Sequence, residues 1–300
     1  MKQCDTQTGC ALPDSPNNIS NESNSDISSQ VNRESLNQVD IVFVTDPICS
    51  HCWAIEPAWR RLQLTFEFKT RYIHGGLLPG WQGFSDAANG ISKPIDVIPH
   101  WQHVTKVSGQ PIDPGMWADD PIDNSYILCR AAIAVRCIKP ESESLFLRKM
   151  REAVLLKAQN ATRPEILKSL AEQAGISAEL FSEALQSIKV ETIFLQERQE
   201  MLNLGARGFP SFIFLGKTVD KLVGMQSFEH LANRLLSHKK NKLVSRNLSD
   251  KQKLQSFDCW TLTEAAEVLQ VNKTAAKPRL IDCGFVKSDF AGEDVWILSE

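Results

Sequence analysis

The chain has 300 residues, of which 42% are hydrophobic and 23% are charged, values typical of a globular protein that buries a core. No apolar run approaches the roughly 18 residues that a membrane span requires, so the sequence excludes a transmembrane protein. The formal net charge of -3 excludes a general affinity for nucleic acid or anionic lipid.

The first 38 residues are expected to form a disordered tail that carries two cysteines. The chain starts without the apolar segment of a secretory signal, which favours a cytoplasmic protein with reduced thiols. Residues 14–38 are mainly Ser and Asn, so they cannot bury enough apolar surface to offset the entropy of ordering. Cys4 and Cys10 are compatible with a redox pair or with part of a metal site, although no histidine accompanies them.

Order is expected to begin at the β-branched run of residues 39–44, which predicts a strand buried on both faces. A helix with a kink at Pro57 follows, and residues 70–76 predict a second short strand. From about residue 84 to residue 204 the apolar spacing and the stop signals predict successive helices. Two strands at hairpin spacing and one helix come next, over residues 208–216, 217–225 and 227–238.

The C-terminal part divides into a basic linker, residues 239–255, and a small unit, residues 256–300. The unit predicts two helices and a hairpin, with Thr263 as the first N-cap and a turn near Gly292, an order typical of a winged helix-turn-helix. It carries four Lys or Arg and eight Asp or Glu, whereas a protein that reads a duplex needs a basic face. We therefore expect a protein-interaction or lid module and no nucleic-acid partner.

The sharpest chemical signal is the CSHC motif between the first strand and the following helix. Unpaired N–H groups and the positive dipole at a helix N-terminus stabilise a thiolate. Cys49 is therefore the expected nucleophile of thiol–disulfide exchange, and Cys52 resolves the mixed disulfide. Ser50 and His51 lie between them and are expected to tune the site. A zinc site would need a second ligand pair at finger spacing, which is lacking; two buried structural cysteines are the other alternative.

A proline before a later strand gives the motif its context. The bond between Phe209 and Pro210 can be cis, and the backbone of the preceding residue can then pair with an extended chain, so both residues are expected to bind substrate. Together these features resemble the DsbA-like family of the thioredoxin superfamily. The matching segments are FVTDPICSHCWAIEPAW, HGGLLPG and LGARGFPSFIFL.

The resemblance covers about residues 39–238 and implies an α/β thioredoxin fold interrupted by a helical domain at about residues 84–204. It also implies that Pro210 is cis and packs against the cysteine pair. Phe209 departs from the smaller residue common in the family and is expected to tune redox potential and substrate access. The implied activity is a disulfide reductase or isomerase that acts on protein disulfides or small thiols and needs no cofactor.

Two further functions stay open. A Cys-bearing tail, a DsbA-like domain and a small C-terminal unit are similar to the layout of ClpXP adaptors of the SpxH kind, whose N-terminus is rich in Cys and His. Kappa-class glutathione transferases and hydroxychromene carboxylate isomerases share the fold, but they typically have a serine in the active position or lack the second cysteine.

Other residues near these motifs have a structural interpretation beside a functional one. The tryptophans are expected to form core or lid packing, or else an apolar groove for a peptide or thiol; they are Trp53, Trp59, Trp81, Trp101 and Trp117. Four cysteines are expected to be buried thiols, the last two with a second redox pair as the alternative; they are Cys129, Cys137, Cys259 and Cys283.

Overall fold

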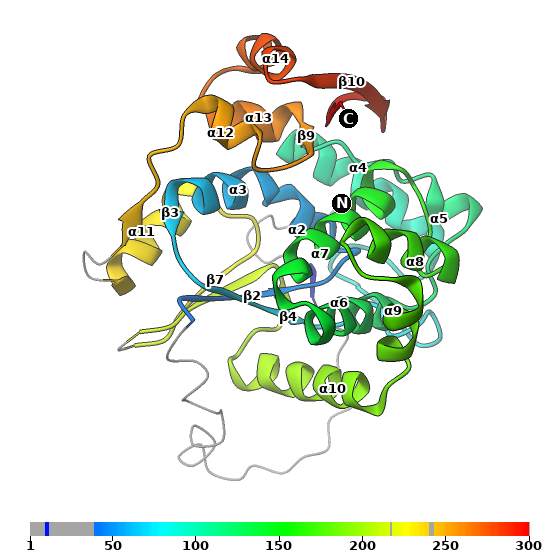
Figure 1. Cartoon of the computed structure of the whole chain (residues 1–300). Coiled ribbons are helices and arrows are strands. Elements are labelled where there is room, and N and C mark those ends of the chain that lie inside the picture. Colours follow the sequence, from blue (N-terminus) through cyan, green and yellow to red (C-terminus); the bar gives the residue numbers. More distant parts are fainter. Residues whose placement is uncertain (1–9, 12–38, 217, 240–242, 300) are drawn as a thin grey trace.

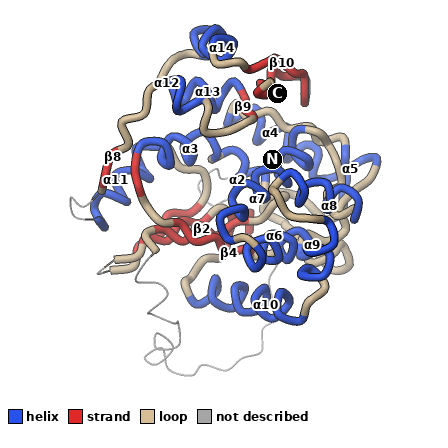
Figure 2. Tube along the Cα trace, viewed as in Figure 1, coloured by secondary structure: helices blue, strands red, loops and turns tan. Residues whose placement is uncertain are grey.

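The computed structural model describes residues 10–11, 39–216, 218–239 and 243–299. Its centre is a four-stranded sheet in the order β4-β2-β6-β7. The strands are β2 (Ile41–Thr45), β4 (Thr70–His74), β6 (Ser211–Phe214) and β7 (Asp220–Val223). β2 runs parallel to β4 and antiparallel to β6, and β7 pairs antiparallel to β6 (Figures 1 and 2).

The apolar run of β2 is buried on both faces of the sheet, as the sequence predicts. Phe43 points to the side of Trp59, with ring centroids 5.0 Å apart, while Val42 packs in a cluster with Met201. Trp59 belongs to α3 (Glu56–Thr65), and Met201 belongs to α10 (Ile188–Asn203). Helices therefore cover both faces of the sheet, with α3 and α10 on opposite sides (Figure 1).

The helix after β2 is interrupted before its proline. α2 (Ser50–Ala54) ends at Ile55, and α3 begins at Glu56 with Pro57 in its first turn. Proline fits the first turn of a helix because the N–H that it lacks has no partner there. The kink expected at Pro57 is thus a junction of two helices.

The predicted helical region between β4 and β6 is confirmed. Its 3-10 and π turns are η2 (Pro94–Asp96), η3 (Pro140–Ser142) and η4 (Glu152–Leu156). Its α-helices are α4 (Val97–Ser108), α5 (Met116–Asp119), α6 (Tyr126–Ile138), α7 (Glu143–Arg151), α8 (Pro164–Gln173), α9 (Ala178–Leu185) and α10. This α/β arrangement is a thioredoxin fold with a helical insertion. No helix in the described ranges has the length and apolar character to cross a membrane.

The C-terminal unit has the predicted order of two helices and a hairpin, and it packs on α3. The elements after β7 are α11 (Phe228–Lys239), β8 (Val244–Ser245), α12 (Asp250–Leu254), β9 (Cys259–Thr261), α13 (Leu262–Leu269), α14 (Lys273–Asp282), β10 (Phe285–Phe290) and β11 (Glu293–Leu298). Strands β10, β11 and β9 form a three-stranded antiparallel sheet.

Two expectations for this part differ from the structure. The segment read as a solvated linker contains β8, which pairs with β3 (Phe66–Glu67), and α12, whose Leu254 is buried under the C-terminal unit. The N-cap of α13 is Thr261 and not Thr263. Thr261 forms a capping box with Glu264, whereas the Thr263 hydroxyl donates to the carbonyl of Gly109.

Candidate functional site

The CSHC motif lies where β2 ends and α2 begins. Cys49 is the N-cap residue of α2, and its Sγ accepts the N–H of Cys52 at 3.2 Å. The donated N–H and the helix dipole both favour a negative charge on that sulfur. Neither cysteine has exposed surface in this structure, the exposed fraction of each being 0%.

The predicted proline edge lies beside the two cysteines. The peptide bond from Phe209 to Pro210 is cis, as the resemblance implies. Phe209 ends the two-residue strand β5 (Gly208–Phe209) and packs in the same apolar cluster as Cys49 and Cys52. The structure thus brings Phe209, the residue before the cis proline, together with Cys49 and Cys52.

The bulk of Phe209 is accommodated by a glycine. A Cβ atom added to Gly75, directly after β4, would overlap the ring of Phe209 and would also crowd the sulfur of Met201. Gly75 belongs to the HGG sequence that carries part of the family resemblance. The missing side chain at Gly75 therefore makes room for the large residue before the proline.

The N-terminal tail reaches the same edge. β1 (Cys10–Ala11) pairs antiparallel with β5, so that Cys10 lies opposite Phe209 and Ala11 opposite Gly208. Cys4, the other tail cysteine, lies outside the described residues. Within the described residues there is no group of three or more His, Cys, Asp or Glu side chains that could hold a metal ion.

A histidine that sequence reasoning missed contacts the motif. His100 of α4 has its Nε2 3.3 Å from the hydroxyl of Ser50, and its ring centroid is 5.3 Å from that of His51. All three side chains are buried. His100 lies fifty residues after Ser50 in an ordinary amphipathic helix, so no local pattern marks it.

A cavity of about 40 Å³ adjoins Ser50 and His100. Its walls are largely aromatic and aliphatic side chains, including Trp81, Trp101 and Trp117. The other two tryptophans near the motif, Trp53 and Trp59, are buried in the core. Three of the five tryptophans thus surround a small apolar space beside the cysteines.

A buried carboxyl group, Asp46, lies three residues before Cys49. Its oxygens accept the backbone N–H groups of Leu77 and Ile48 and the hydroxyl of Ser125, at 2.6, 3.0 and 2.9 Å. Burial raises the pKa of Asp46, although these hydrogen bonds oppose the rise. The group therefore joins β2, the HGGLL turn and the start of α6 under the motif.

The thiol of Cys129 also contacts Asp46, with 3.3 Å between Sγ and Oδ2. Burial and the charge of Asp46 raise the pKa of this thiol, so Cys129 stays protonated and acts as a packing residue. Cys259 is likewise buried. Burial and, to a smaller extent, the charge of Glu152 raise the pKa of its thiol. Cys137 and Cys283 are half-buried.

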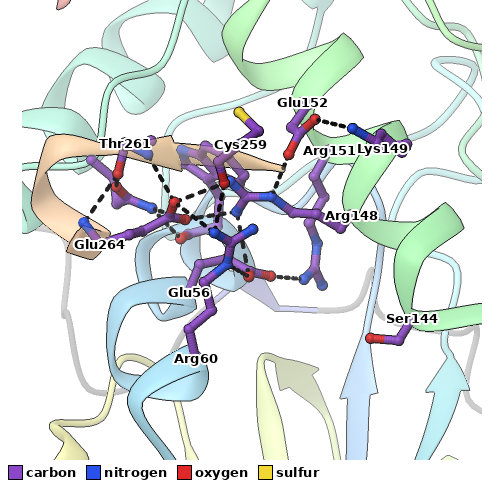
Figure 3. Close-up of polar contacts among 12 residues, drawn as sticks. Glu56, Arg60, Ser144, Arg148, Lys149, Arg151, Glu152, Cys259, Thr261 and Glu264 are labelled. Atoms are coloured by element: carbon purple, nitrogen blue, oxygen red, sulfur yellow. Dashed lines mark hydrogen bonds and ion pairs between the residues drawn. The ribbon is translucent and has the colours of Figure 1, made fainter. Parts of the chain in front are cut away.

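A network of buried charges lies behind the active helix, between α3, α7 and α13 (Figure 3). Arg148 donates to Glu264 at 2.7 Å and to Glu152 at 2.7 Å, and Arg60 lies 3.3 Å from Glu264. Arg151 pairs with Glu56. Burial alone would raise the pKa of Glu264, but the charges of Arg148 and Arg60 outweigh it and hold that pKa below its usual value.

This network contacts the residue after the second cysteine. The guanidinium of Arg148 lies 4.3 Å from the ring centroid of Trp53, and Gln110 connects the carbonyl of Trp53 to Glu264. Two local signals mark parts of it: the i,i+4 pairs Glu56–Arg60 and Arg148–Glu152, and the capping box that includes Glu264. The contacts between Glu264 and the two arginines join elements far apart in the sequence, so no spacing predicts them.

Comparisons with known proteins agree with this geometry. The family model described as Thioredoxin matches residues 42–231. The ClpXP adapter protein SpxH of Halalkalibacterium halodurans is 31% identical over 223 residues, which cover 74% of this chain and 71% of that protein.

Two solved structures have the same fold. The cytosolic disulfide reductase DsbM of Pseudomonas aeruginosa superposes with a TM-score of 0.51 at 20% identity, covering 61% of this chain and 88% of that one. A candidate protein disulfide isomerase of Nitrosomonas europaea superposes with a TM-score of 0.58 at 22% identity, covering 67% and 98%.

Proposed function

Because the chain belongs to the thioredoxin family, as a DsbA-like member of the SpxH type, we propose that it carries out thiol–disulfide exchange through Cys49 and Cys52. The observation that carries the proposal is the position of Cys49 at the N-cap of α2, with its sulfur accepting the N–H of Cys52 at 3.2 Å beside the Phe209–Pro210 edge. The structural neighbour named as a cytosolic disulfide reductase supports the reductase direction and a cytoplasmic location.

The reaction has two exchange steps. The Cys49 thiolate attacks one sulfur of a substrate disulfide, which forms a mixed disulfide and releases the other substrate sulfur as a thiolate. Cys52 then attacks Cys49 Sγ, which releases the second substrate thiol and leaves a Cys49–Cys52 disulfide. The Cys52 proton passes to a departing thiolate, so two protein thiols are oxidised and one substrate disulfide is reduced.

The surrounding residues have supporting roles in this proposal. Phe209 and Pro210 present a backbone edge to an extended substrate chain, as strand addition requires. Ser50, His51 and His100 contact one another at the motif. In this proposal they tune the charge near the sulfur of Cys49, because a neighbouring imidazolium favours a thiolate. The substrates are protein disulfides or small-molecule thiols.

Reduction of insulin by the full chain with dithiothreitol tests the assignment. We expect Cys49→Ala to abolish the stimulated rate and Cys52→Ala to accumulate a mixed disulfide with the substrate, because only the resolving step is lost. Cys283→Ser, in the C-terminal unit, is the matched control and keeps the wild-type rate. Full activity in Cys49→Ala would make the catalytic assignment wrong.

A second candidate function is that of a protease adaptor. It is supported by the 31% identical relative that is named as a ClpXP adapter. In this proposal residues 39–238 form the DsbA-like domain, and residues 256–300 contribute to binding a protein partner. Capture of ClpX by the full chain, with equal yield from wild type and from Cys49→Ala/Cys52→Ala, would favour the adaptor; loss of capture in that variant would tie binding to the exchange site.

A further inference from the structure

A cavity of about 450 Å³ lies between the thioredoxin core and the C-terminal unit. Arg60 of α3 and Arg148 and Arg151 at the end of α7 line it on the side of the core. Gln255 and Phe257, from the segment between α12 and β9, line it on the side of the C-terminal unit. Pockets of about 300–1,000 Å³ at domain interfaces are common places for small molecules to bind. The cavity therefore has the size and the position of a ligand site, and the CSHC motif contributes nothing to its walls.

The walls of this cavity combine apolar surface with charge. Trp59 and Phe257 both line it, and the guanidinium of Arg60 lies 4.2 Å from the ring centroid of Phe257. Ser144 and Leu145 also line the cavity and are exposed, so it is open to solvent. A ligand that matches these walls has an apolar body next to a charged group.

The charged part of the wall is short of carboxylates. The three arginine side chains are between 2% and 8% exposed, and all three lie near Glu56 (Figure 3). Among the described residues that line the cavity, Glu56 is the single buried acid. The other two acids, Glu141 and Asp258, are exposed, and Asp258 already pairs with Lys149 at 2.7 Å. Three buried guanidinium groups thus share one buried carboxylate at this surface.

Two of these arginines have N–H groups to spare. Arg151 Nε is buried and has no hydrogen-bond partner in the part of the chain that the structure describes. Within that same part, the hydrogen bond and the ion pairs of Arg60 use only its Nε and Nη1 atoms. Burial and then the charge of Arg148 lower the pKa of Arg60, so nearby acids do not fully compensate its charge. A guanidinium group binds the oxygens of a carboxylate or phosphate through such N–H donors.

We propose that this cavity binds a small organic anion, a carboxylate or phosphate on an apolar body, with Arg60 and Arg151 as the residues that bind its oxygens. The hydroxyl groups of Tyr72 and Ser144, 3.3 Å apart on the same wall, are further donors to the anion. The apolar body lies against Trp59 and Phe257. Because this ligand contacts both the core and the C-terminal unit, it stabilises the docked unit, and it does so independently of thiol–disulfide exchange.

Titration calorimetry on the full chain tests the proposal with phenyl phosphate and benzoate as probes. Benzamide, which has the shape of benzoate without its charge, is the matched control ligand. We expect saturable binding of at least one of the two anions at millimolar concentration. Benzamide is expected to bind about tenfold more weakly or less, because hydrogen bonds between charged groups are the strongest that the site offers.

Variants of the full chain locate the bound anion. Ser144→Trp puts an indole into the cavity without removing a charge and is expected to weaken anion binding about tenfold or more. Ser169→Trp, at an exposed serine of α8, is the matched control and keeps the wild-type affinity. Arg151→Lys keeps the positive charge but loses the Nε–H donor, so it is expected to weaken binding of the anion about tenfold. Urea unfolding of each variant shows that it is folded.

Three results would overturn the proposal. The absence of saturable binding with both anions at millimolar concentration would mean that the cavity takes no ligand of this class. Equal affinities for benzamide and the anions would mean that the arginines do not select a charge. Wild-type affinity in a folded Ser144→Trp variant would place the bound anion elsewhere on the protein.

Discussion

The two ends of the chain contact the thioredoxin core in different ways. The N-terminal contact is the two-residue strand β1, paired through its backbone to β5. The C-terminal contact is the buried network in which Glu264 of α13 meets Arg60 of α3 and Arg148 of α7 (Figure 3). Another extended chain can replace the first contact at little cost, whereas opening the second leaves charges buried without partners. The comparison contrasts an end held by short backbone pairing with an end held by buried charges.

The largest loss of stability is expected when the C-terminal contact is broken. Glu264→Ala leaves the guanidinium groups of Arg60 and Arg148 buried and undercompensated, which costs about 3–5 kcal/mol of unfolding free energy. Urea unfolding measures this value. Glu267→Ala is the control on the same helix, because Glu267 is 35% exposed in its pair with Arg61 and is worth about 0–1 kcal/mol. Equal losses in the two variants would mean that the network does not hold the unit.

A smaller effect is expected where Phe209 of β5, the strand that pairs with β1, meets Gly75. Gly75→Ala inserts a methyl group into the volume of the Phe209 ring and destabilises the fold by about 1–3 kcal/mol. The second change Phe209→Val removes the overlapping ring atoms, so the double variant recovers part of the loss. Additive losses in the double-mutant cycle would show that the two residues do not share this space.

The stability contributed by the C-terminal network and that contributed by Asp46, under the CSHC motif, should also change in opposite directions with pH. The lowered pKa of Glu264 means that its contribution is full above pH 4.5 and is lost as the pH falls through that lowered pKa. The raised pKa of Asp46 means that stability falls as the pH rises from 3.8 through that raised pKa, since the unfolded state loses its proton first.

Unfolding curves between pH 3 and pH 7 test this contrast. Glu264→Gln is expected to reduce the loss of stability in acid. Asp46→Asn is expected to reduce the loss of stability as the pH rises above 3.8. Each change amounts to about 1.4 kcal/mol of unfolding free energy for each unit of pKa shift removed. Parallel pH profiles for wild type and both variants would contradict the assigned directions.

Much of this architecture follows from local patterns. Short stretches of the sequence predict the buried strand, the cysteines at the helix start and the helical insertion. The structure confirms all three. His100 and Arg148 were not predictable, because their roles depend on elements that meet only in the folded chain. Thr263 was the wrong cap because Thr261, two residues earlier, has the glutamate of the capping box.

The pairing of β1 was also beyond sequence reasoning. Cys10 stands in a polar tail with no strand pattern, and its partner Phe209 is about two hundred residues away. The linker was misread for a related reason, since a scattered apolar side chain such as Leu254 becomes meaningful only when it packs in one cluster with Trp260 of the C-terminal unit. Long-range pairing of short segments leaves little trace in composition or periodicity.

The most direct test of the central claim is the redox titration of Cys49 and Cys52 in the full chain, equilibrated with glutathione buffers and read by alkylation and mass spectrometry. The account predicts a reversible two-electron transition in which both cysteines change together, and its loss in Cys49→Ala. Cysteines that stay unchanged across the whole range of glutathione ratios would contradict the claim that this pair carries out disulfide exchange.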